Sequence, residues 1–337
     1  ERPEYFALYG FANESHGSVA QLANNNNALG LVKGTVRIGV NINIPVLNWS
    51  DNYNVSENAR LWVDGGTVLK NNGNSLVPYG EVKVSNGTLE AKVPSGITTR
   101  DNGVITVTGG TINANQIRTS VLGTTHIGAY NQSGGYVNVL GQNTTTDYYV
   151  FNLTYDDNVF VMSGGTLHVH QSQGKGGIFI ASTEGNYDVT GGTVILEIDD
   201  NEDFPITSRA PFWNVILRRT SATVKEFILK EGVDVGASDI DLPAQPLIAL
   251  NDLTIEDNAI LNANGTDVKV GRNFDLKTNG TYTAAANTTW FIGNQNSNIY
   301  ARNNSVPAPL KFYNVNISKE QTFSPGTYRT VSIGNTG

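Results

Sequence analysis

A short acidic run is the densest group of potential metal ligands in the sequence. It comprises Asp199, Asp200, Glu202 and Asp203. Carboxylate oxygens from one loop can coordinate Ca²⁺, but this run lacks the glycine-turned spacing of an EF-hand loop. The nonapeptide repeat of calcium-binding β-rolls is also absent from the sequence. We therefore favour a solvated loop, keep the four acids as a weak calcium candidate, and expect no other cofactor.

Two histidines are placed where they could share a ligand. His168 and His170 stand two residues apart on an expected strand, so both side chains project from the face opposite Leu167 and Val169. Two imidazoles can bind zinc, but no third ligand is apparent in the sequence. We interpret them as a surface pair without metal.

The pattern of charged residues does not predict an active site. Asp64, Glu90 and Glu197 do not fall at one repeat position, and Arg218-Arg219 has no carboxylate motif beside it. Polysaccharide lyases and hydrolases need carboxylates, or a carboxylate with a base, on adjacent coils. We accordingly predict no catalytic residues and no enzymatic activity.

The elements that carry these residues repeat along the chain. A short alternating run, a Gly-Gly or Asn-Gly pair, one residue that is usually Thr, and a second alternating run occur six times. The residues after the glycine pairs are separated by 21, 23, 25, 30 and 27 positions: Thr67, Thr88, Thr111, Tyr136, Thr166 and Thr193. Self-similarity at this period is typical of a solenoid or array.

The alternation of apolar and polar residues predicts strands rather than helices. In Ile105-Thr106-Val107-Thr108 the apolar side chains share one face. The glycine pair allows positive φ, either in a hairpin turn or at a corner of a coiling strand. A period of 20–30 residues matches one turn of a parallel β-helix, whereas a meander needs a turn every 8–12 residues. We expect an all-β, right-handed parallel β-helix with no significant helix.

The rhythm of the repeats divides the chain into three parts. Residues 1–30 are expected to cap the solenoid or to continue a preceding segment, and residues 31–205 to form the Gly-Gly-Thr coils. Residues 206–337 are expected to form a second β-helical segment that continues beyond 337. That segment contains two similar runs, Phe212-Trp213-Asn214-Val215 and Phe312-Tyr313-Asn314-Val315.

Composition narrows the classes of partner and compartment. Charged residues make up 15% of the 337 positions, and the net charge is −8. This charge disfavours nucleic acid and anionic membranes as partners. No apolar run is long enough to insert into a membrane, and the absence of cysteine is compatible with an extracellular setting.

The repeat phrases resemble those of known secreted proteins. The Ser-Gly-Gly-Thr coils are similar to secreted parallel β-helices. Three runs resemble the repeat regions of large Bacteroidota surface proteins: Asp257-Asn258-Ala259-Ile260-Leu261, Val270-Gly271-Arg272-Asn273-Phe274-Asp275-Leu276 and Phe312-Tyr313-Asn314-Val315-Asn316-Ile317. Those proteins include gliding-motility-type adhesins exported by the type 9 secretion system.

The resemblance implies a secreted or cell-surface location and contact with that export machinery. It implies a stalk or adhesive segment that projects from a cell and contacts glycans or surfaces. The alternative is a β-helix polysaccharide lyase or glycoside hydrolase. The two differ in whether charged side chains from different coils converge in one groove.

Overall fold

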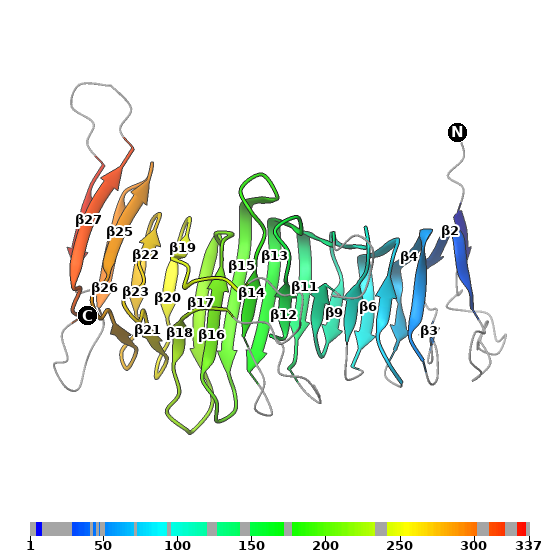
Figure 1. Cartoon of the computed structure of the whole chain (residues 1–337), viewed down its shortest axis with the longest axis horizontal. Coiled ribbons are helices and arrows are strands. Elements are labelled where there is room, and N and C mark those ends of the chain that lie inside the picture. The colour runs from blue at the N-terminus through cyan, green and yellow to red at the C-terminus, as the bar shows by residue number, and fades with distance from the viewer. Residues whose placement is uncertain are drawn as a thin grey trace.

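The described part of the chain consists of strands and turns. The computed structural model describes residues 5–8, 29–40, 43–44, 47, 51–70, 73–92, 96–119, 127–141, 149–171, 177–232, 241–301, 310–320 and 329–334. These residues contain no helix. They form a parallel β-solenoid of about ten turns, which confirms the predicted fold class. Figure 1 shows the strands side by side along the long axis, from β2 near one end to β27 at the other.

The strands stack in parallel ladders that run along this axis. The first half of the solenoid is built on long or paired strands: β1 (Tyr5–Leu8), β2 (Leu31–Ile38), β3 (Asn43–Ile44), β4 (Tyr53–Leu69), β6 (Glu81–Ala91), β8 (Val104–Val107), β9 (Thr111–Ala114), β11 (Ala129–Val139), β13 (Val159–Gln171) and β15 (Tyr187–Ile198). A second ladder holds short strands: β5 (Leu76–Pro78), β7 (Ile97–Thr99), β10 (Ile117–Thr119), β12 (Phe151–Leu153), β14 (Ile178–Ile180), β16 (Phe204–Ser208), β18 (Phe227–Leu229), β21 (Ile260–Asn262) and β24 (Thr281–Thr283).

The later coils extend the same ladders and add a new one. The ladder of β15 continues through β17 (Asn214–Arg219), β20 (Leu253–Ile255), β23 (Phe274–Leu276), β26 (Ser297–Ala301) and β28 (Val331–Gly334). A separate four-stranded sheet contains β19 (Leu247–Ala249), β22 (Val268–Val270), β25 (Thr288–Gly293) and β27 (Asn314–Lys319). The expected boundary at 205/206 lies inside β16, and the pairings of β15 with β17 and β16 with β18 cross it. The division into two segments stays a prediction.

The glycine pairs form corners rather than hairpin turns, since the strands on either side pair in parallel with the coils before and after. In five of the six corners the glycine just before the Thr or Tyr takes positive φ, as at Gly110 (+66°) and Gly135 (+69°), and in the sixth the positive φ is at Gly65 (+111°). The first glycine is needed for a different reason. A Cβ on Gly134 would lie 2.5 Å from the carbonyl oxygen of Thr108 in the preceding coil. The pair therefore serves both the bend and the close stacking of coils.

Apolar side chains stack in rows inside the solenoid. One row runs through ten successive coils and every member is at most 3% exposed: Val68, Leu89, Ile112, Val137, Leu167, Val194, Val215, Leu253, Phe274 and Ile299. Near the middle, the rings of Tyr130, Phe151, Phe160 and Phe212 pack with centroids 5.1–6.3 Å apart. This continuous core holds the outward-facing side chains at a fixed spacing.

Candidate functional site

A row of ionisable side chains crosses the outer face where β13, β15 and β17 lie side by side. His170, Glu197 and Arg218 occupy the same register position on these three strands. Glu256, which follows β20, extends the row. Arg218 donates to Glu256 from Nε at 2.8 Å and from Nη2 at 3.2 Å, and its Nη1 lies 3.8 Å from Glu197 Oε2. Ionisable side chains from four coils therefore meet on one face.

His168 lies two residues before His170 on β13 and contacts this row through Glu197. Its Nε2 lies 2.8 Å from Glu197 Oε2, and its Nδ1 lies 2.5 Å from the hydroxyl oxygen of Tyr136. Because a carboxylate only accepts, Nε2 carries a proton, and in the neutral ring Nδ1 then accepts from the tyrosine. The side chain is buried, with 6% of the residue exposed. The arrangement is a carboxylate–imidazole–hydroxyl relay that ends at the partly exposed Tyr136.

The electrostatics of the site keep Glu197 ionised. Burial favours the neutral carboxyl, but hydrogen bonds from His168 and Thr220, together with the two imidazoles, outweigh it and lower the pKa of Glu197 to about 2. The hydrogen bond to Glu256 is the main cause that raises the pKa of Arg218 above its usual value. Burial is the main cause of the raised pKa of the Tyr136 hydroxyl. The site thus holds a fixed carboxylate and a fixed guanidinium beside a neutral phenol.

His170 lies at one end of a chain of polar side chains. Its Nδ1 is 3.0 Å from Asp199 Oδ2, and its Nε2 is 2.8 Å from Asn138 Oδ1. The Asn138 amide donates onward to Asn113 at 3.4 Å, and Asn113 donates to Glu90 at 2.8 Å. The chain fixes the direction of each amide, because the carboxylate of Glu90 can only accept.

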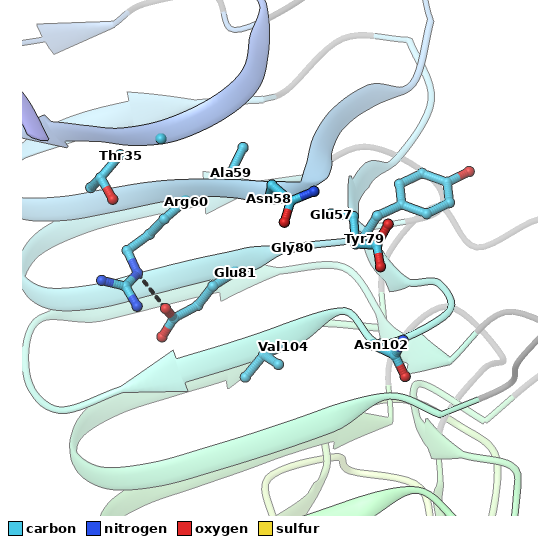
Figure 2. Close-up of a pocket in the computed structure, with 11 residues that line it drawn as sticks. Thr35, Glu57, Asn58, Ala59, Arg60, Tyr79, Gly80, Glu81, Asn102 and Val104 are labelled. Atoms are coloured by element: carbon cyan, nitrogen blue, oxygen red, sulfur yellow. Dashed lines mark hydrogen bonds and ion pairs between the residues drawn. The ribbon is translucent and has the colours of Figure 1, made fainter. Parts of the chain in front are cut away.

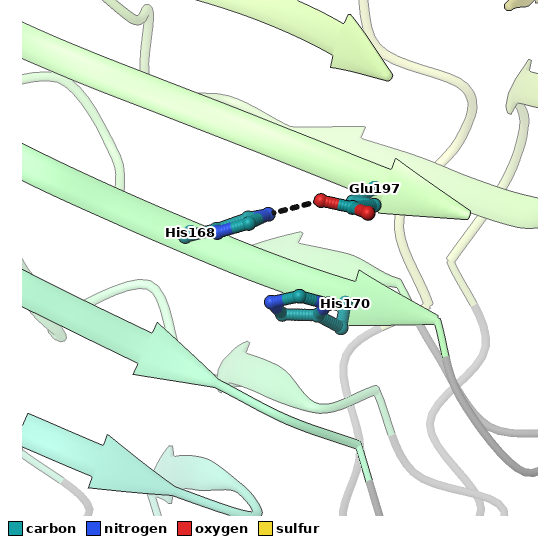
Figure 3. A group of neighbouring side chains, drawn as sticks. All are labelled: His168, His170 and Glu197. Atoms are coloured by element: carbon teal, nitrogen blue, oxygen red, sulfur yellow. Dashed lines mark hydrogen bonds and ion pairs between the residues drawn. The ribbon is translucent and has the colours of Figure 1, made fainter. Parts of the chain in front are cut away.

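The structure corrects part of the interpretation of the two histidines. Their shared face opposite Leu167 and Val169 is confirmed, since both aliphatic side chains lie in the core. The prediction of a surface pair is wrong for His168, which Tyr136 and Glu197 contact. Figure 3 shows Glu197 of β15 beside the two imidazoles of β13.

The repeat spacing could have identified Glu197 as the third potential ligand beside the two histidines. Thr166 and Thr193 are 27 positions apart, and adding the same offset to His170 gives Glu197. A comparison of the acids alone does not show this relation, because it joins an acid to a histidine.

Three of the four acids proposed as a calcium candidate contact different partners. Asp199 contacts His170, Asp200 accepts from the backbone amide of Asn201, and Asp203 accepts from that of Glu226. In the described part of the chain, the one group of three potential ligand side chains that lie together is His168, His170 and Glu197. The solvated loop expected at Asp199, Asp200, Glu202 and Asp203 stays a prediction, and so does the alternative of a calcium site there.

An open cavity of about 520 Å³ lies on the N-terminal coils, away from this row. Figure 2 shows Arg60 of β4 paired with Glu81 of β6 across it, with Tyr79 and Asn102 at its far side. Exposed ion pairs of this kind contribute little stability. The walls of the cavity mix polar and apolar residues, and no histidine lines it.

No family model, no curated protein and no solved structure matches this chain. Among the residues that the structure describes, no helix is long and apolar enough to cross a membrane.

Proposed function

We propose that this chain is a structural and adhesive segment of a large exported cell-surface protein, and that it contacts glycans or other surfaces along its outer face. The resemblance of its repeats to Bacteroidota adhesins supports export by the type 9 system and an extracellular location. The proposal therefore includes type 9 export, an extracellular location and the absence of enzymatic activity.

One observation carries the adhesive role: a column of hydroxyl side chains that follows the glycine corners. The column takes one residue from each of six successive coils: Thr67, Thr88, Thr111, Tyr136, Thr166 and Thr193. Parallel strands place these residues at intervals of about 4.8 Å. Tyr136 is 37% exposed and interrupts the threonines with an aromatic ring. Hydroxyls repeated along a rigid rod, with one exposed ring, suit shallow contact with a polymeric glycan.

The experiment is a binding screen of the purified chain against a glycan array and intact bacterial cells. Thr166→Glu places a charge on the column and should weaken binding at least tenfold. Thr106→Glu is the matched control, because Thr106 lies in the strand before a glycine corner and pairs with Lys83 and Asn131 instead. Absence of binding to every glycan and cell type, or equal loss in both variants, would contradict the adhesive role.

One observation speaks for the enzyme alternative, namely that ionisable side chains from several coils meet at Glu197. The relay from Glu197 through His168 to Tyr136 could move a proton to or from a sugar, and Arg218 could bind a substrate carboxylate. A panel of uronic-acid and neutral polysaccharides should be assayed for unsaturated products and for new reducing ends. Turnover that is lost in both Glu197→Gln and Tyr136→Phe would replace the adhesive proposal with this one.

A further inference from the structure

Two imidazoles and a carboxylate form a compact donor group on the outer face of the solenoid. The rings of His168 and His170 lie with centroids 4.0 Å apart and planes inclined by 32°. One ligand atom from each ring and one carboxylate oxygen of Glu197 all lie within 4.8 Å of one another. Figure 3 shows the three side chains on the same side of β13 and β15. Side-chain rotations that bring these ligand atoms closer together would give the spacing of a tetrahedral metal site.

Each imidazole is also oriented by a second neighbour. Tyr136 contacts Nδ1 of His168, and Asp199 contacts Nδ1 of His170. Metal-binding histidines characteristically have their other ring nitrogen held in this way by a carboxylate, carbonyl or other polar group. The Nε2 atoms then face Glu197 and Asn138. A tyrosine hydroxyl can donate or accept a hydrogen bond. His168 can therefore carry its ring proton on Nδ1, donate to Tyr136, and leave the lone pair of Nε2 for a metal.

Acidic side chains surround the two imidazoles. Nε2 of His168 lies beside Glu197 Oε2, and Nδ1 of His170 lies beside Asp199 Oδ2. The carboxylates of Glu197, Asp199 and Glu256 lie around this group together with one guanidinium, that of Arg218. Such a surplus of acidic side chains favours a bound cation.

We propose that His168, His170 and Glu197 bind a divalent transition-metal ion of the zinc class. Two nitrogen donors and one carboxylate suit zinc, cobalt or nickel, whereas Ca²⁺ requires six to eight oxygens. The ion would join β13 to β15 across neighbouring coils. Three protein ligands leave one tetrahedral position for water or for an oxygen of an external ligand.

The test uses the full chain after treatment with EDTA. Co²⁺ is added first, because tetrahedral cobalt has a strong visible absorption, and Zn²⁺ is then titrated by calorimetry. We expect one equivalent to bind, Zn²⁺ to displace Co²⁺, and the melting temperature to rise with Zn²⁺ but not with an equal concentration of Ca²⁺.

The variants separate this site from chance binding. His170→Gln and Glu197→Gln should each weaken Zn²⁺ binding at least a hundredfold. Asp64→Asn is the matched control, because this carboxylate also projects outward but pairs with Arg37 on the N-terminal coils. Melting of each metal-free variant confirms folding. Absence of Co²⁺ absorption and Zn²⁺ heat in the parent chain, or unchanged affinity in His170→Gln, would overturn the proposal.

Discussion

A buried lysine on the N-terminal coils, Lys70, lowers the free energy of unfolding of this fold. Lys70 is 0% exposed, and burial lowers the pKa of its ammonium from 10.5 to about 8 although Asp51 partly offsets the shift. Below pH 8 the folded state must hold a charge in a site that disfavours it. Each pKa unit corresponds to about 1.4 kcal/mol, so the shift corresponds to roughly 3 kcal/mol.

We expect Lys70→Met to be more stable than the parent chain by up to about 3 kcal/mol at pH 6.5. The unfolded chain holds the lysine proton up to a higher pH than the folded chain. The free energy of unfolding of the parent chain therefore rises between pH 8 and 10.5. The difference in this free energy between Lys70→Met and the parent chain should narrow over the same range. Urea midpoints at pH 6.5, 8 and 9.5 measure it. A gap independent of pH would show that the ammonium is fully compensated by its neighbours.

The glycine corners determine stability at the scale of the element. Gly134 has ordinary φ, but an added Cβ would press on a backbone carbonyl of the previous coil. Gly265 has φ +78° and open space around it. The two positions therefore separate the need for close stacking from the need for positive φ.

Gly134→Ala should cost about 2–3 kcal/mol, because a stacked backbone cannot move away without disturbing both coils. Gly265→Ala should cost about 1 kcal/mol, the usual penalty of a side chain in the left-handed region. Equilibrium denaturation of both variants makes the comparison. Similar losses at the two sites would mean that the coils can relax apart and that only φ matters.

The whole molecule is held together by contacts between neighbouring coils. Phe160 is fully buried among Tyr130, Phe151 and Phe212, all of which come from nearby coils. Solenoids of this kind behave as one-dimensional arrays in which a local change is felt mainly by adjacent repeats.

Phe160→Ala should lose about 3–5 kcal/mol of local stability through the cavity it leaves. Amide hydrogen exchange should accelerate in β11, β13 and β15 and stay near parent rates in β22 and β25. Mass spectrometry of native-state exchange distinguishes the two regions. Equal acceleration along the entire chain would indicate a single cooperative unit instead of an array.

The sequence by itself determined the fold class of this protein. Alternation with period two, a glycine corner and a repeat of 21–30 residues together fit a coiling parallel strand, since each feature is local and recurs in every coil. The column of hydroxyl side chains after the glycine corners follows from the same repeat. The second role of the first glycine did not follow, because it depends on a carbonyl group in the coil beneath.

Only the tertiary structure decided which residues meet on the outer face. Glu197, Arg218 and Glu256 have uneven spacings of 21 and 38 positions, since the turns between strands differ in length, yet stacking places them side by side. The burial of His168 likewise depends on Tyr136 and Glu197 from the coils before and after it. A sequence repeat specifies the path of one coil, whereas the partners of an outward side chain are set by the register between coils.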